Sequence, residues 1–162
     1  MKRRNPQERG KYSKSKGKSF EDRMSIKMTE LTGTKWLRIP ASGGWKKMEG
    51  ISGDLFFESN PGKTPYHVEC KSGRGWSFRD LLKGKGLLWD WVSQALFDDK
   101  YNRPIVLFIS FGGVIYIGLN RVSFEKGGWN CLEWFNWYFG TLPSFVKNVG
   151  RLDENEDERE TS

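Results

Sequence analysis

The stretch from Ile105 to Leu119 constrains the fold more than any other part of the 162-residue chain, because it contains no charged residue. It is too short for a membrane-spanning helix, which needs about 20 apolar residues. Gly112 and Gly113 divide it into two halves rich in β-branched residues, IVLFISF and VIYIGL. Two such runs around a glycine turn are typical of a hairpin. The sequence therefore predicts a buried hairpin here, not a membrane segment.

Helices are expected on both sides of this hairpin in the chain. Apolar residues recur at helical spacing from Phe20 to Leu31, with Ser19 as a candidate N-cap and Gly33 as a stop, which predicts a helix over 19–32. The segment LLWDWVSQALFDDKYN predicts a second helix of about 15 residues, whose core face includes Leu96. The Trp-rich segment WNCLEWFNWYF is expected to form a final helix.

Three further strands are expected before the hairpin, over 36–40, 54–59 and 66–71. The segment NPGKTP supplies Pro and Gly for a turn between the last two, which predicts that they form an antiparallel hairpin. The resulting order is one helix, three strands, a helix, two strands and a helix. Such an order favours an α/β fold with a central mixed five-stranded sheet flanked by helices.

Charge is distributed unevenly along the chain, whose formal net charge is +7. Residues 1–18 are predicted to be a flexible basic arm, 19–150 a single folded domain, and 151–162 an acidic disordered tail. A basic arm favours a polyanionic partner, nucleic acid before membrane, because no apolar face accompanies the charges. The arm serving only solubility is the alternative. The two cysteines show no CxxC spacing, so we expect no zinc site or disulfide framework, and a reducing cytoplasm.

Side-chain alternation brings chemical groups together on the strand YHVECK. His67, Glu69 and Lys71 share one face, and Asp54 begins the strand expected to pair with it. Two converging carboxylates are hard oxygen ligands of the type that Mg²⁺ prefers. A lysine beside the metal can orient water or stabilise charge on a phosphate. This pattern predicts metal-assisted hydrolysis of phosphodiesters.

Asp54, followed after fourteen residues by Glu69-Cys70-Lys71, resembles the D…ExK signature of the PD-(D/E)xK nuclease superfamily. The flanking segments KGKSFEDRM and RIPASGG are similar in order and spacing to the archaeal-type Holliday junction resolvases, which also occur in viruses. The resemblance covers about residues 17–111 and leaves out the Trp-rich segment. It implies a restriction-endonuclease-like core and a crossover-junction endodeoxyribonuclease of DNA recombination and repair.

The resemblance also implies a metal site. Asp54, Glu69 and the backbone carbonyl of Cys70 would bind Mg²⁺, for which Mn²⁺ can substitute, and Glu21 would complete the shell through water. Glu21 as a favourable acid in the first turn of a helix is the alternative.

Three more residues take roles from the same resemblance. Lys71 would orient the attacking water or stabilise the transition state, Ser42 would touch the scissile phosphate, and Gln94 would lie near the site. Ser42 as a plain loop serine, Gln94 as a solvent-facing side chain and Glu69–Lys71 as an exposed ion pair are the competing interpretations.

Branched DNA is the expected partner, recognised by shape through phosphate contacts. The candidate DNA contacts are Lys14, Lys16, Lys18, Lys46, Lys47, Arg74, Arg79 and Gln94. Family members are homodimers that make two symmetric nicks, so a homodimer without membrane attachment is expected, acting in the cytoplasm and in a host cell if virus-encoded. The alternatives are another nuclease of the superfamily (nicking, flap-cleaving or restriction-like) and a non-catalytic basic nucleic-acid-binding module.

Overall fold

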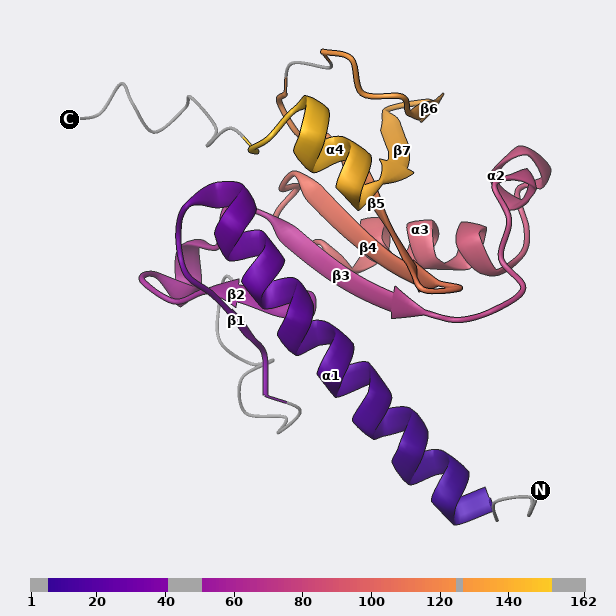
Figure 1. The fold of residues 1–162 in the computed structure, drawn as a ribbon. Coiled ribbons are helices and arrows are strands. Elements are labelled where there is room, and N and C mark those ends of the chain that lie inside the picture. The colour runs from indigo at the N-terminus through magenta and orange to yellow at the C-terminus, as the bar shows by residue number, and fades with distance from the viewer. Residues whose placement is uncertain (1–5, 41–50, 125–126, 153–162) are drawn as a thin grey trace.

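A computed structural model describes residues 6–40, 51–124 and 127–152, with side chains from residue 17 onward. The elements in chain order are α1 (Pro6–Thr32), β1 (Trp36–Arg38), β2 (Leu55–Phe57), the 3-10 turn η2 (Pro61–Lys63), β3 (His67–Ser72), α2 (Arg79–Lys83), α3 (Leu87–Asp98), β4 (Ile105–Phe111), β5 (Val114–Asn120), β6 (Leu132–Trp134), β7 (Trp137–Thr141) and α4 (Leu142–Asn148). Figure 1 shows a sheet with α1 and α4 on one face and α3 on the other.

The central sheet has the strand order β3-β4-β5-β7-β6. The strands β3 and β4 are parallel, and the other neighbours are antiparallel. The predicted α/β class with a mixed five-stranded sheet between helices is therefore confirmed, as is the hairpin of β4 and β5. The membership of the sheet differs from the prediction, because β1 and β2 form a separate two-stranded sheet and β6 and β7 take their places.

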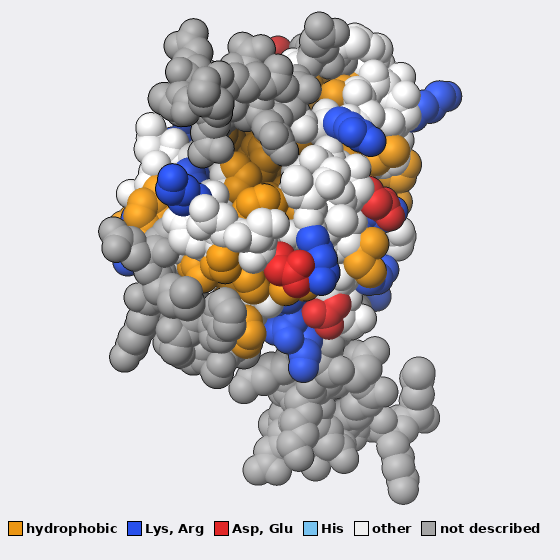
Figure 2. Space-filling model, turned by 90° about the vertical axis from the view of Figure 1, so that its left-hand side faces the viewer, with side chains coloured by type: hydrophobic (Ala, Val, Ile, Leu, Met, Phe, Trp, Pro, Cys, Tyr) orange, Lys and Arg blue, Asp and Glu red, His pale blue; other side chains and the backbone are white. Residues whose placement is uncertain are grey.

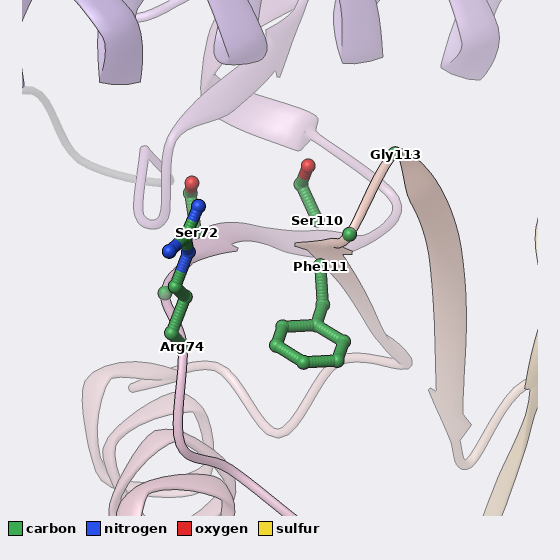
Figure 3. A pocket seen from close by; sticks show the side chains of 7 residues that line it. Ser72, Arg74, Ser110, Phe111 and Gly113 are labelled. Atoms are coloured by element: carbon green, nitrogen blue, oxygen red, sulfur yellow. The ribbon is translucent and has the colours of Figure 1, made fainter.

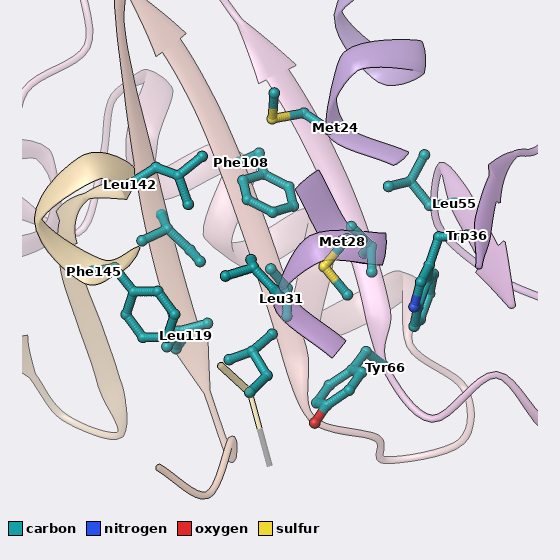
Figure 4. Packing of buried hydrophobic residues seen from close by; sticks show 14 of the residues in the cluster. Met24, Met28, Leu31, Trp36, Leu55, Tyr66, Phe108, Leu119, Leu142 and Phe145 are labelled. Carbon is teal, nitrogen blue, oxygen red and sulfur yellow. The ribbon is translucent and has the colours of Figure 1, made fainter. Parts of the chain in front are cut away.

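Successive side chains of β4 point to opposite faces of the sheet and contribute to the two halves of the core. Val106 and Phe108 pack with the α1 side chains Met24 and Met28 and with α4, as Figure 4 shows. The residues between them, such as Leu107, pack against α3 and β7 on the other face. Residues 105–109 of β4 are all buried, and a strand that is buried on both faces has a nearly continuous apolar sequence, which explains the first part of the uncharged stretch.

The predicted hairpin between β2 and β3 is wrong. The strand β2 pairs with β1, while β3 pairs in parallel with β4 over six residue pairs. Between β2 and β3 the 3-10 turn η2 begins at Pro61 and redirects the chain. The two consecutive side chains Leu55 and Phe56 are both buried, in different clusters. The backbone of β2 is paired with β1, and its side chains are buried on both faces.

The Trp-rich segment forms the β6–β7 hairpin and not the predicted helix. Trp137 and Phe139 point to one side of the sheet and Tyr138 to the other, which is the period of a strand. Phe135, with φ 49°, forms the turn between the strands. Aromatic side chains favour strands where a sheet is available for packing, and the final helix is instead α4.

The helix bounds also differ from the predictions. The first helix begins at Pro6 instead of Ser19, so residues 6–18 of the predicted flexible arm are helical; proline suits a first helical turn, and the Gln, Glu, Arg and Lys that follow are good helix formers. The second helix, α3, ends at Asp98, and Leu96 is exposed.

The predicted domain end at residue 150 lies slightly too early. Leu152 is buried, and its N–H donates to the carbonyl of Leu31 at 3.0 Å, so the packed part of the chain reaches this residue. The rest of the predicted acidic tail, from residue 153, lies outside the described residues. Within the described ranges, no helix combines the length and apolarity needed to cross a bilayer.

Candidate active site

β3 is an edge strand of the central sheet, and Gly53 and Asp54 lie along the edge of β3 that faces away from β4. Gly53 has φ +85°, and a Cβ atom there would lie 2.4 Å from the carbonyl oxygen of Val68. Next to it, the N–H of Asp54 donates to the same Val68 carbonyl at 2.7 Å, and the carbonyl of Asp54 accepts from Ile39 at 2.8 Å. Backbone hydrogen bonds on both sides therefore fix Asp54 between the small sheet and the large one.

The Asp54 carboxylate turns towards β3. Its Oδ2 accepts the N–H of Cys70 at 2.8 Å. Burial and then the charge of Glu69 raise the pKa of Asp54 to about 7, although the Cys70 hydrogen bond opposes the shift. The N–H and C=O of one strand residue point to the same edge, so the Cys70 carbonyl also faces the side on which Asp54 lies.

Glu69 lies on the α3 side of β3 and is only 4 % exposed. Its Oε2 is 2.8 Å from Nζ of Lys71, and its Oε1 is 3.3 Å from Nε2 of His67. Burial by itself raises the pKa of Glu69, but the adjacent His67 side chain and the charge and hydrogen bond of Lys71 outweigh it, so the pKa is lowered. Glu69 is thus a carboxylate at neutral pH, next to an Asp54 that ionises with difficulty.

Lys71 is held from two sides. Besides Glu69, its ammonium group donates to Oε1 of Gln94 on α3 at 3.0 Å. The amide nitrogen of Gln94 donates to Asp98 one helical turn later at 3.2 Å, which orients the Gln94 oxygen towards Lys71. The structure therefore brings Gln94 to the predicted site.

Glu21 faces this site from α1. Its negative charge contributes to the raised pKa of Asp54, and Oε2 lies 3.9 Å from Nη1 of Arg38. Among the described residues, no three His, Cys, Asp or Glu side chains lie close enough together to hold one ion directly. Glu21 is thus near Asp54 without forming a three-carboxylate cluster.

Three residues that the sequence analysis did not assign form a connected group, of which His67 is next to Glu69. His67 is fully buried, and its Nδ1 lies 2.7 Å from Oγ of Ser52. Ser52 in turn accepts a hydrogen bond from Nη2 of Arg103. Two signals pointed to this group: His67 is the single histidine of the chain and shares a strand face with Glu69, and Ser52 precedes Asp54 by two positions.

The remaining candidates divide by position. Ser42, Lys46 and Lys47 lie outside the described residues, and Lys14 and Lys16 lie in the part of α1 whose side chains are not described. Lys18, Arg74 and Arg79 are exposed. On the face shown in Figure 2, acidic and basic side chains of the described residues lie next to one another. Lys35 and Glu58 form an ion pair, with 2.7 Å between Nζ and Oε1.

Two neighbouring pockets lie at the C-terminal end of β3. One, of about 420 Å³, is lined by Cys70 and Lys71 together with Gly17, Phe20 and Trp91. The other, of about 600 Å³, is lined by Arg74, Ser110 and Phe111 (Figure 3). Both include Ser72 and Gly73, so a hollow surface runs from Lys71 to Arg74.

Residues 12–120 match a family model described as "Phage putative PDDEXK endonuclease". The chain belongs to this PDDEXK family. The matched range runs from α1 to β5 and contains Asp54, Glu69 and Lys71, whereas β6, β7 and α4 lie beyond it. The family places the chain among the PD-(D/E)xK nucleases and does not separate a Holliday junction resolvase from other endonucleases of this type. No curated protein and no solved structure matched the chain.

Proposed function

We propose that this PDDEXK protein is a Mg²⁺-dependent endodeoxyribonuclease that nicks branched DNA, with four-way junctions as the preferred substrate. The observation that carries the proposal is the convergence of Asp54, Glu69 and Lys71 at the open end of β3. A buried carboxylate with a raised pKa beside a second, ionised carboxylate is electrostatically costly. A divalent cation between them would remove that cost.

The donor set fits such a cation. Asp54 and Glu69 supply carboxylate oxygens, and the Cys70 carbonyl faces the same edge. Mg²⁺ keeps several waters and binds through one or two carboxylates plus substrate phosphate, so two carboxylates are enough. Glu21 would bind one of these waters, and Mn²⁺, which accepts the same ligands, would substitute. When bound, the ion supplies Lewis-acid activation of the phosphate and acidification of water.

Within the described part of the chain, Lys71 keeps one N–H donor for the substrate. An ammonium group has three N–H bonds, and Glu69 and Gln94 accept two of them. The third can reach into the pocket that Lys71 lines. There it can orient the attacking water or stabilise the charge that grows on the phosphate, and the two fixed partners hold it in position for either task.

The neighbouring pocket extends this surface for DNA. Arg74 offers a planar donor group for a phosphate next to the scissile one. Contacts of this kind position a duplex without reading its bases, which suits recognition by shape in DNA recombination and repair. Because two symmetric nicks resolve a four-way junction, we propose a homodimer with one site per protomer. The word phage in the family description supports a virus-encoded protein, which would act in the cytoplasm of an infected cell.

The test uses labelled four-way junctions, flaps and linear duplex, each incubated with Mg²⁺, with Mn²⁺ and with EDTA. Paired nicks near the crossover, abolished by EDTA, are expected. Cleavage of flap or duplex alone would show that the protein is another PD-(D/E)xK nuclease and not a resolvase. Binding without any cleavage would favour a non-catalytic nucleic-acid-binding module. Sedimentation of the protein alone would test the dimer.

A further inference from the structure

A chain of polar contacts leads from the end of α3 to Glu69. Arg103 donates from Nε to Oδ1 of the buried Asp99 at 3.3 Å and from Nη2 to Oγ of Ser52. Oγ of Ser52 lies 2.7 Å from Nδ1 of His67, whose Nε2 lies 3.3 Å from Oε1 of Glu69. Every link except the last is a hydrogen bond, and the last is a close approach of the buried Nε2 of His67 to the Glu69 carboxylate.

The chemistry of the groups sets the direction of each link. A guanidinium can only donate, so Oγ of Ser52 accepts from Arg103 and its own O–H remains for Nδ1 of His67. The carboxylate of Glu69 can only accept, so a hydrogen on Nε2 of His67 suits the 3.3 Å approach to Oε1. Donation from Arg103 to Ser52 and from Ser52 to His67 favours the same Nε2–H form.

Both candidate active-site residues of β3 are thus supported from the same end of α3. Asp99, which also contacts Nη2 of Arg121 at 3.2 Å, anchors the chain that reaches Glu69. Its neighbour Asp98 accepts from Gln94, which holds Lys71. Arg103 makes a further bond to the carbonyl of Thr64 at 3.1 Å, so its position is fixed by several elements.

We propose that Ser52 and Arg103 are positioning residues that hold His67 as the Nε2–H tautomer and thereby fix the orientation of the Glu69 carboxylate for metal binding. The metal part of this proposal rests on the proposed function, whereas the tautomer part does not. Outer-shell partners of metal ligands commonly change metal affinity by about 10- to 100-fold when removed. Ser52 is the cleaner position to change, because Arg103 also contacts Thr64 and Asp99.

The first experiment reads the tautomer directly in the metal-free protein. His67 is the single histidine of the chain, so a long-range ¹H–¹⁵N spectrum shows one imidazole. We expect Nε2 protonated and Nδ1 bare in the wild type and in Ser52→Thr, which keeps the hydroxyl. Ser52→Ala should shift the imidazole towards a mixture of forms. A wild-type ring protonated at Nδ1, or at both nitrogens, would overturn the proposal, as would an unchanged spectrum in Ser52→Ala.

The second experiment titrates Mn²⁺ alone into each protein by calorimetry. Ser52→Ala should raise the Kd for Mn²⁺ about 10-fold or more at unchanged stoichiometry, and Ser52→Thr should restore it. The control Ser144→Ala removes a hydroxyl that accepts from Asn148 on α4, and should leave the Kd unchanged. An unchanged Kd in Ser52→Ala would overturn the positioning role. A wild type that binds no Mn²⁺ would overturn the metal-dependent function as well, which separates the two failures.

Discussion

The backbone N–H of Cys70 donates a 2.8 Å hydrogen bond to Oδ2 of Asp54. This bond connects the segment before β2 to the edge of the main sheet, and it places one carboxylate beside Glu69 without any pairing between β2 and β3. The candidate site is therefore assembled from two separate sheets. Its geometry depends on the close approach of residues 53 and 54 to β3.

Asp54→Asn and Glu69→Gln should each lose DNA cleavage by several orders of magnitude and still bind four-way junctions. The amides keep the size of the side chains but lose the charge that a divalent cation requires, whereas phosphate contacts come from basic residues. Cleavage and gel-shift assays on the same protein preparations would check this. Near-normal cleavage by either variant would rule that carboxylate out as a metal ligand.

The metal-free protein should lose stability as pH rises from about 4 to about 8, in part because of Asp54. Its pKa is about 7 in the folded state, against 3.8 for an ordinary Asp side chain. In this range the folded state binds more protons than the unfolded state, so the free energy of unfolding falls with rising pH. Asp54→Asn should therefore melt at a higher temperature than the wild type at pH 8.

The same comparison at pH 5 provides the control, because Asp54 is then protonated in the folded state and the difference should be smaller. Mg²⁺ at pH 8 should stabilise the wild type and leave Asp54→Asn nearly unchanged. Equal melting temperatures for the two metal-free proteins at pH 8 would contradict an electrostatic cost at Asp54.

Gly53→Ala should damage the site, and Gly113→Ala should not. Both glycines have positive φ, +85° and +83°, so both substitutions carry a backbone cost of about 1–2 kcal/mol. Only at Gly53 would the new Cβ collide with backbone, 2.4 Å from the Val68 carbonyl, whereas nothing lies within 4 Å at Gly113. Gly53→Ala should separate Asp54 from Cys70 and abolish Mn²⁺ binding.

Thermal melts and calorimetry would measure both effects. If the two alanine variants lost the same stability and both bound Mn²⁺ normally, the close packing of Gly53 on β3 would not position Asp54.

Arg74→Ala should weaken junction binding and reduce the slope of log affinity against log salt concentration by about 1, because one phosphate contact is lost. The matched control is Lys35→Ala, since Lys35 is engaged with Glu58 on the β1–β2 side. Fluorescence anisotropy between about 50 and 200 mM salt would give both slopes. Equal slopes for Arg74→Ala and the wild type would show that Arg74 does not contact a DNA phosphate.

Local patterns were enough for much of the site. Alternation along HVECK puts Glu69 and Lys71 on one face of β3 whatever the strand pairs with, because the period of two belongs to the strand itself. The glycine pair between two apolar runs predicted the β4–β5 hairpin for the same local reason. Both features are present in the structure, although the strand pairing predicted around them was partly wrong.

Other features were decided only by tertiary structure. An apolar run in the sequence does not specify which strand it pairs with. The pairing of β2 with β1, and the presence of Trp137 in a strand, therefore depended on which apolar surfaces of the folded protein were available for packing. The link between Arg103 and Ser52 joins residues 51 positions apart, and no local pattern encodes such a contact. The sequence by itself determined which groups are available for chemistry at β3, and packing of the two sheets and α3 determined how they are held.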